Sequence, residues 1–169
     1  FKSKKQHKDN FKIITVSRLV KYKRIRDLII ASAPILKEYA KASLFIIGRG
    51  PEEENLKSLA KNLNIQNHVF FKNNLTRTDF LKELKSAKVF CLPSEIEGFG
   101  IATIEAAAAR IPYVVSDIEV FKEVTRNGQG GLIFELGNIS DLSSKLKKLL
   151  IDKKLYETKS KEAQNLTKF

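Results

Sequence analysis

The chain has 169 residues, which is enough for one domain with a single core and too few for two ordinary domains. Its apolar content of 43% excludes a globally disordered chain, and its formal net charge of +12 would attract polyanions such as nucleic acid, anionic lipid or phosphorylated ligands. The single cysteine, Cys91, excludes an internal disulfide and fits a reducing compartment, and no apolar run approaches the roughly 18 residues of a membrane-spanning helix.

The N-terminal part of the chain is its most basic part. Residues 1–26 contain ten lysines and arginines and one acidic residue, Asp9. We interpret residues 1–10 as a solvated, basic and polar lead-in, and residues 11–169 as one folded domain. The chain begins at Phe1 and contains no methionine, so we expect an excised domain, part of whose active site lies elsewhere.

Predicted strands and helices alternate along the chain. Short apolar runs predict strands at 11–16, 43–47, 68–71, 89–92, 113–116 and 131–134. Helical spacing of apolar residues predicts helices at 25–40, 52–63, 76–87, 101–110, 120–126 and from about 140 to the end, the last in one or two pieces. Pro34 is expected to kink the first helix or break its hydrogen bonding. Thr76 and Asp79 have the spacing of a capping box.

This alternation predicts an α/β fold, a Rossmann-like parallel sheet with helices on both faces. The strands are nearly continuous apolar runs, which is typical of strands covered on both sides. In such sheets ligands bind at the carboxyl ends of the strands, so the residues directly after each strand are the candidates for a site.

The first candidate segment follows the strand at 11–16. Arg18 comes directly after this strand, and Lys23 lies five residues further on, at most about 17 Å away in an extended chain. A looped segment can therefore direct both cations at one diphosphate. An attraction of roughly 4 kcal/mol per charge pair at 4 Å would stabilise a departing diphosphate. From this segment alone, a basic loop without a ligand is an equally good interpretation.

The second candidate segment follows the strand at 89–92. Gly98 and Gly100 allow a ligand to approach the backbone, and they precede a helix whose free amides favour an anion. Glu97 lies in the loop, and Glu105 lies beside the apolar stripe expected at Ile101, Ile104 and Ala108, where a carboxylate needs a partner such as a sugar hydroxyl. The alternative is a surface Glu97 and a salt-bridged Glu105.

The run from Glu97 through Gly98-Phe99-Gly100 to Glu105 resembles the E-x7-E motif of glycosyltransferase family 4, the group 1 transferases, which are retaining GT-B enzymes. The resemblance covers nearly the whole chain. Further matching segments are 16–19 with Lys23, the turn at 46–51, the strand at 68–72, and the segments 112–117, 123–124 and 130–134. Single motifs of this set are weak, but their order and spacing together are specific.

The resemblance implies that this chain is the donor-binding, C-terminal half of a metal-independent hexosyltransferase. Arg18 and Lys23 would hold the donor diphosphate and act in catalysis together with Glu97, which contacts the transferred sugar. Glu105 would bind the ribose hydroxyls. The other implied donor-binding residues are Ser17, Gly48, Gly50, Asn73, Leu75, Gly98, Phe99, Gly100 and Ile101.

Three residues depart from the family pattern, since Ser17, Arg24 and Arg110 each stand where the family commonly has glycine. Arg24 would either crowd the phosphate loop or add a third cation. An Asp-x-Asp pair, a third glycine after Gly48 and Gly50, and a Cys/His cluster are all absent from the sequence, so no metal site and no dinucleotide fingerprint is predicted. Cys91 lies inside a strand and is interpreted as a core residue.

The resemblance also implies partners and a location. The donor would be a UDP- or GDP-linked sugar without a further cofactor, and the acceptor a glycan or glycolipid bound by an absent N-terminal domain. The fragment alone would be inactive, and the enzyme cytoplasmic, with peripheral contact to the inner face of the membrane. The alternative is a basic α/β module that binds nucleic acid or an anionic membrane. This alternative explains the charge but not the two glutamates. The glycosyltransferase interpretation, by contrast, predicts no specific nucleic-acid partner.

Overall fold

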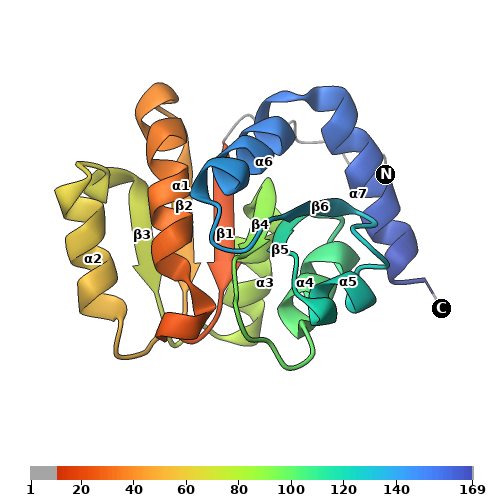
Figure 1. The fold of residues 1–169 in the computed structure, drawn as a ribbon, viewed down its shortest axis with the longest axis horizontal. Helices are drawn as coiled ribbons and strands as arrows, with labels where there is room; N and C mark the ends of the chain where they lie inside the picture. The colour runs from red at the N-terminus through yellow and green to blue at the C-terminus, as the bar shows by residue number, and fades with distance from the viewer. Residues whose placement is uncertain (1–10, 169) are drawn as a thin grey trace.

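The computed structural model describes residues 11–168, so the predicted lead-in at 1–10 lies outside the described residues. The strands are β1 (Lys12–Val16), β2 (Ser43–Ile47), β3 (Val69–Lys72), β4 (Val89–Leu92), β5 (Tyr113–Ser116) and β6 (Gly131–Phe134). The helices are α1 (Ile25–Glu38), α2 (Glu53–Asn62), α3 (Arg77–Ser86), α4 (Ile101–Ala108), α5 (Glu119–Val124), α6 (Ile139–Ile151) and α7 (Lys153–Leu166). Two short 3-10 helices are η1 (Lys21–Lys23) and η2 (Gln66–His68). Figure 1 shows this arrangement.

The six strands form one parallel sheet in the order β3-β2-β1-β4-β5-β6. The chain builds the sheet outward from β1 in one direction, through β2 to β3, and then returns to place β4 on the other side of β1. The strand order therefore reverses between β1 and β4. In a doubly wound sheet the carboxyl ends of two such strands border a crevice where ligands bind.

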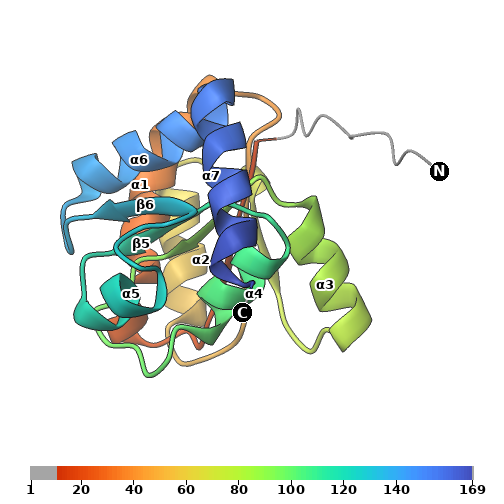
Figure 2. The same cartoon turned by 90° about the vertical axis from the view of Figure 1, so that its right-hand side faces the viewer.

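Helices cover both faces of the sheet, as the sequence predicted. Ile13 packs into a core with α1, α2 and α6, while its neighbour Ile14 packs into a second core with α3, α4 and α7, because successive side chains of a strand point to opposite faces. Figure 2 separates the two layers, with α1 and α6 on one side of the sheet and α3 and α4 on the other.

Helix α6 shows how the sequence pattern produces this packing. Leu142, Leu146, Leu149 and Leu150 follow helical spacing and are all buried against the first core. Burial of each leucine side chain contributes about 1.5–3 kcal/mol before conformational entropy is counted. The helical region predicted from about 140 onward is divided at Asp152, which caps α7 by accepting a hydrogen bond from the Leu155 amide at 2.9 Å.

The effect expected of Pro34 does not end helix α1, which continues through the proline to Glu38, because its buried face, which includes Ile35 and Leu36, packs on both sides of it. One expectation about helices was wrong. Helix α4 does not bury the stripe expected at Ile101 and Ala108. Its buried residues are Thr103, Ala106 and Ala107, because the helix turns its small side chains to the sheet.

Helix α3 is attached to the sheet mainly through polar contacts. Leu84 is its one fully buried side chain. Glu83 accepts hydrogen bonds from Lys12 at 2.5 Å and from Lys72 at 2.7 Å, and both ammonium groups also lie over the Phe45 ring. At the other end, Thr76 caps the helix by accepting from the Asp79 amide at 3.1 Å, which confirms the predicted N-cap, although the Thr76 hydroxyl also donates to the Asp79 carboxylate.

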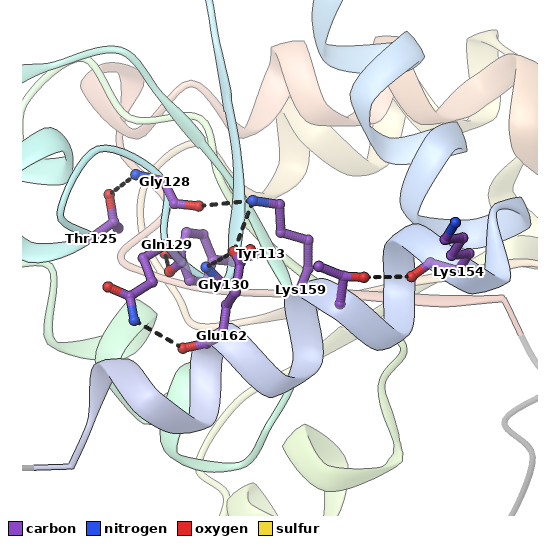
Figure 3. A network of polar contacts seen from close by, with 9 residues as sticks. Tyr113, Thr125, Gly128, Gln129, Gly130, Lys154, Lys159 and Glu162 are labelled. Carbon is purple, nitrogen blue, oxygen red and sulfur yellow. Dashed lines mark hydrogen bonds and ion pairs between the residues drawn. The ribbon is translucent and has the colours of Figure 1, made fainter.

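Helix α7 is fastened to the loop before β6 by the polar network of Figure 3. The Glu162 carboxylate accepts from the Gly130 amide at 3.0 Å and pairs with Lys159 at 2.9 Å. The buried Tyr113 hydroxyl donates to the Gln129 carbonyl. Burial raises the pKa of the Tyr113 phenol, which therefore stays a donor. The predicted helix at 120–126 ends at Val124, because the loop that follows contains four residues with positive φ, Arg126, Asn127, Gly128 and Gly130.

Candidate donor-binding site

The loop after β1 and the turn after β2 are in close backbone contact. A Cβ atom on Gly48 would lie 1.8 Å from the Ser17 carbonyl oxygen, and one on Gly50 would lie 2.4 Å from the Leu19 carbonyl oxygen. The Leu19 amide donates to the Arg49 carbonyl at 2.9 Å. Glycine is required at both positions because any side chain would separate the two segments. The structure therefore brings together two segments that the sequence placed in the site.

The loop after β4 is joined to the loop after β1. The Glu95 amide donates to the Tyr22 carbonyl at 2.9 Å, and Lys23 Nζ donates to the Ile96 carbonyl at 3.4 Å. Lys23 Nζ also pairs with Glu97 Oε2 at 2.7 Å. These are the carboxyl ends of the two strands at which the sheet order reverses, so two residues predicted to be catalytic meet at the crevice.

The Lys23–Glu97 pair is shielded from solvent. Side-chain exposure is 13% for Lys23 and 16% for Glu97, so removal of either partner would leave a poorly solvated charge. The Lys23 ammonium has three protons, and its two acceptors among residues 11–168 leave one of them for a further anion. The arrangement can therefore present a cation and a carboxylate to one ligand.

Glu105 has a partner that the sequence did not predict. Arg77 Nη1, on the first residue of α3, donates to Glu105 Oε1 at 2.8 Å. Arg77 is 65% exposed and Glu105 28% exposed, so this pair is accessible to a competing ligand. Glu105 is thus salt-bridged. Arg77 directly follows the predicted N-cap at Thr76, and this position at the carboxyl edge of the sheet was the signal that could have revealed it.

The remaining predicted residues lie around the same edge of the sheet. Arg18 is exposed in the loop after β1, and Asn73 and Leu75 lie in the loop between β3 and α3. The Phe99 and Ile101 side chains are 78% and 64% exposed. Gly98 has open space around it, while Gly100 is the left-handed N-cap of α4. In the view of Figure 1 these loops gather below the sheet.

Arg24 directs its guanidinium at two carboxylates. It adopts the left-handed conformation with φ 53° and ψ 35°, which explains why glycine suits this position. Its Nε pairs with Asp27 at 2.8 Å and its Nη1 lies 3.6 Å from the Glu95 carboxylate. Arg110 is also left-handed, with φ 61°. Both departures from glycine are therefore accommodated by the backbone.

Three further observations concern residues 11–168. No group of three or more histidine, cysteine or acidic side chains is arranged there to hold a metal ion. Within the same range, none of the helices has both the length and the apolar character needed to cross a membrane. Cys91 is buried, as predicted, and burial raises the pKa of its thiol.

The parallel sheet and the loops around the crevice define an α/β protein of the Rossmann-like class, and comparison with known proteins identifies the family. The family model described as "Glycosyl transferases group 1" matches residues 1–166. The chain therefore belongs to the group 1 glycosyl transferases. This finding supports the glycosyltransferase interpretation over the alternative of a nucleic-acid-binding module.

Individual relatives agree with this assignment. A glycosyltransferase of Haemophilus influenzae, itself uncharacterised, is 33% identical over 92% of this chain and 44% of its own length. The N-acetyl-alpha-D-glucosaminyl L-malate synthase of Bacillus anthracis is 31% identical over 90% of this chain and 39% of its own length. The crystal structure of a TarM mutant of S. aureus, in complex with fondaparinux, alpha-GlcNAc-glycerol and UDP, has a TM-score of 0.85 at 25% identity and covers 94% of this chain and 32% of its own. The chain spans less than half the length of these relatives.

Proposed function

We propose that this chain is the donor-binding domain of a retaining glycosyltransferase and that it binds a nucleoside-diphosphate sugar at the carboxyl ends of β1 and β4. The observation that carries the proposal is the Lys23–Glu97 pair at 2.7 Å, formed across the two loops at which the sheet order reverses. A free proton on Lys23 and a carboxylate beside it suit a ligand in which a phosphate adjoins a sugar.

In this proposal each predicted residue has a role along the donor. Arg18 and Lys23 hold the diphosphate and stabilise the charge that grows on it as the glycosidic bond breaks. Each cation within 4 Å of a phosphate oxygen contributes roughly 4 kcal/mol of attraction at an effective dielectric constant of 20. The amides at the start of α4 add to this field, because the N-terminus of a helix attracts anions.

The two glutamates hold the two sugars of the donor. Glu97 and the backbone of Gly98 and Phe99 contact the transferred sugar. Glu105 accepts hydrogen bonds from the ribose hydroxyls, either in place of Arg77 or beside it. The nucleobase lies between the turn that contains Gly48 and the loop at 72–75.

Transfer itself requires more than this chain. The acceptor, a glycan or a lipid-linked saccharide, binds to a separate N-terminal domain, so the fragment alone binds donor weakly and transfers little sugar. The UDP in the TarM complex and the glucosaminyl transfer named for the Bacillus anthracis relative support a nucleotide-linked hexose as donor. UDP and GDP are the nucleotides to test first. We place the whole enzyme in the cytoplasm, in peripheral contact with the inner membrane face through its acceptor.

The test is a thermal-shift screen with UDP, GDP, ADP, UDP-glucose, UDP-N-acetylglucosamine and GDP-mannose. A nucleotide at 100 times its Kd stabilises a protein by about 2.7 kcal/mol, which raises the Tm of a domain of this size by about 5–10 °C. Arg18→Ala and Glu105→Ala should lose most of this shift while remaining folded, because one loses a phosphate contact and the other the ribose contact.

Matched controls are available on the same chain. Lys161→Ala and Glu157→Ala remove exposed charges of the same sign from α7, away from the loops after β1 and β4, and should keep the full shift. Equal loss in the controls would mean that only net charge matters. A flat response of the unmodified chain to every nucleotide in the screen would contradict the proposed function.

A further inference from the structure

Arg24 lies beside three segments: the first turn of α1, the loop after β4, and the turn between β6 and α6. It occupies the junction between η1 and α1, directly after Lys23, and holds a left-handed conformation that non-glycine residues rarely adopt. A residue that retains such a backbone conformation requires surroundings that hold it there.

The guanidinium contacts each of these three segments. Nε pairs with Asp27 Oδ2 at 2.8 Å in the first turn of α1. Nη1 lies 3.6 Å from Glu95 Oε2 in the loop after β4. Nη2 lies 3.4 Å from the position that a Cβ atom on Gly137 would occupy, so the group also lies against the turn between β6 and α6.

Asp27 makes this placement firm. Asp27 is only 9% exposed, and a carboxylate buried to that extent requires a charged or hydrogen-bonded partner. Arg24 supplies it, so the guanidinium is anchored on α1. From this anchor it reaches the Glu95 carboxylate, while the Glu95 amide is bound to the Tyr22 carbonyl at 2.9 Å. Glu95 is thus held at both its backbone and its side chain by the segment around Lys23.

We propose that Arg24 is a positioning residue, which fixes the loop at 94–98 so that Glu97 is presented to the sugar of the donor. This inference rests on the proposed function, because it assigns to Arg24 an effect on the sugar-contacting part of that site. Glu97 lies two residues after Glu95 and pairs with Lys23, the residue before Arg24. The neighbouring residues Lys23 and Arg24 therefore contact Glu97 and Glu95, which lie close together in the loop after β4.

The contacts argue against a direct phosphate contact for Arg24. Two of its nitrogens face carboxylates, and a phosphate would have to compete with both Asp27 and Glu95 for the same group. A phosphate-binding cation would affect UDP and UDP-sugar alike. A residue that positions Glu97 affects only the binding contributed by the sugar. The two roles therefore predict different ratios between the Kd of the free nucleotide and the Kd of the sugar nucleotide.

The first experiment compares the Kd of UDP with that of UDP-N-acetylglucosamine by calorimetry, and repeats the comparison with GDP and GDP-mannose. Arg24→Ala should weaken binding of the sugar nucleotide on the order of tenfold and leave binding of the free nucleotide unchanged. Glu95→Gln, which keeps the backbone conformation of Arg24, should produce a smaller selective loss of about threefold, because its side chain is half exposed. Arg26→Ala should change neither Kd.

A uniform loss for both ligands in Arg24→Ala, no loss in either variant, or a selective loss in Arg26→Ala would each overturn the inference. Amide hydrogen exchange on the free protein separates this outcome from failure of the proposed function. Arg24→Ala and Glu95→Gln should both accelerate exchange at 94–98, whether or not any nucleotide binds. Unchanged exchange there would refute the positioning role even if the nucleotides bind as proposed.

Discussion

Replacement of Gly48 by alanine should separate the first two loops of the crevice. The added Cβ would lie 1.8 Å from the Ser17 carbonyl oxygen, whereas ordinary van der Waals contact begins at 3.4 Å. Gly48 also has φ 143°, a conformation that is essentially restricted to glycine. The backbone must therefore move, because no rotation of a methyl group can relieve this overlap.

The structure indicates how large the effect should be. The movement would weaken two hydrogen bonds, from the Ser17 amide to the Ile47 carbonyl at 3.0 Å and from the Gly48 amide to the Lys72 carbonyl at 2.9 Å. Each contributes about 1 kcal/mol, and the backbone conformation adds about 1–3 kcal/mol. We expect Gly48→Ala to lower the free energy of unfolding by about 3–5 kcal/mol, which is a large part of the 5–15 kcal/mol typical of a domain.

The assay is equilibrium unfolding in urea followed by circular dichroism, with thermal unfolding as a second measurement. A loss of this size should lower the Tm by about 10 °C. Gly98→Ala is the matched control, since nothing lies within 4 Å of its added Cβ, and it should remain within about 0.5 kcal/mol of the unmodified chain. If Gly48→Ala were as stable as Gly98→Ala, the close approach of these two loops would be wrong.

Two predictions concern the network around α7. Tyr113→Phe removes the donor to the Gln129 carbonyl in a buried setting and should lower the free energy of unfolding by about 1–2 kcal/mol, measured as a lower urea midpoint with an unchanged slope; a neutral effect would mean that water satisfies this carbonyl. Burial alone would raise the pKa of Glu162, but its bonds from Lys159 and the Gly130 amide lower it below the usual value. The stabilisation by Glu162 is therefore fully present above its unfolded pKa of about 4.3 and is lost as the pH falls through the lower folded value. Glu162→Gln should accordingly be less stable than the unmodified chain at pH 7, with a difference that shrinks toward pH 3; a difference that stays constant or grows on acidification would refute this assignment.

The order of elements could be predicted from sequence because strands buried on both faces are continuous apolar runs. The strands at 113–116 and 131–134 were predicted with the bounds that the structure has. Helix ends were less predictable, since they depend on turns outside the helix. The predicted strand at 68–71 begins one residue later, after a 3-10 turn in which His68 Nδ1 contacts the Ala42 carbonyl at 2.9 Å.

The candidate site was predictable only in part. Residues directly after β1 and β4 could be found because strand ends are visible in the sequence, and the reversal of strand order then brings Lys23 to Glu97. The buried face of α4 could not be found, because an alanine-rich helix has a weak apolar pattern. The pairing of Glu105 with Arg77, 28 residues apart, and the approach of Arg24 to Glu95 depend on long-range packing.

The attachment of α3 has a consequence for how the chain would be cut by a protease. A segment is cleaved when it opens locally, and opening is easiest where few apolar side chains are buried. Helix α3 buries Leu84 fully and Phe80 partly, and its other contacts include the ion pairs of Glu83 and Arg77, which salt weakens. It also carries Arg77, Lys82 and Lys85, and trypsin can cut the peptide bond that follows each of them. The first tryptic cut within residues 11–168 should therefore fall in α3, and it should come earlier at high ionic strength. It would separate the loop after β1 from the loop after β4, which border the crevice on its two sides.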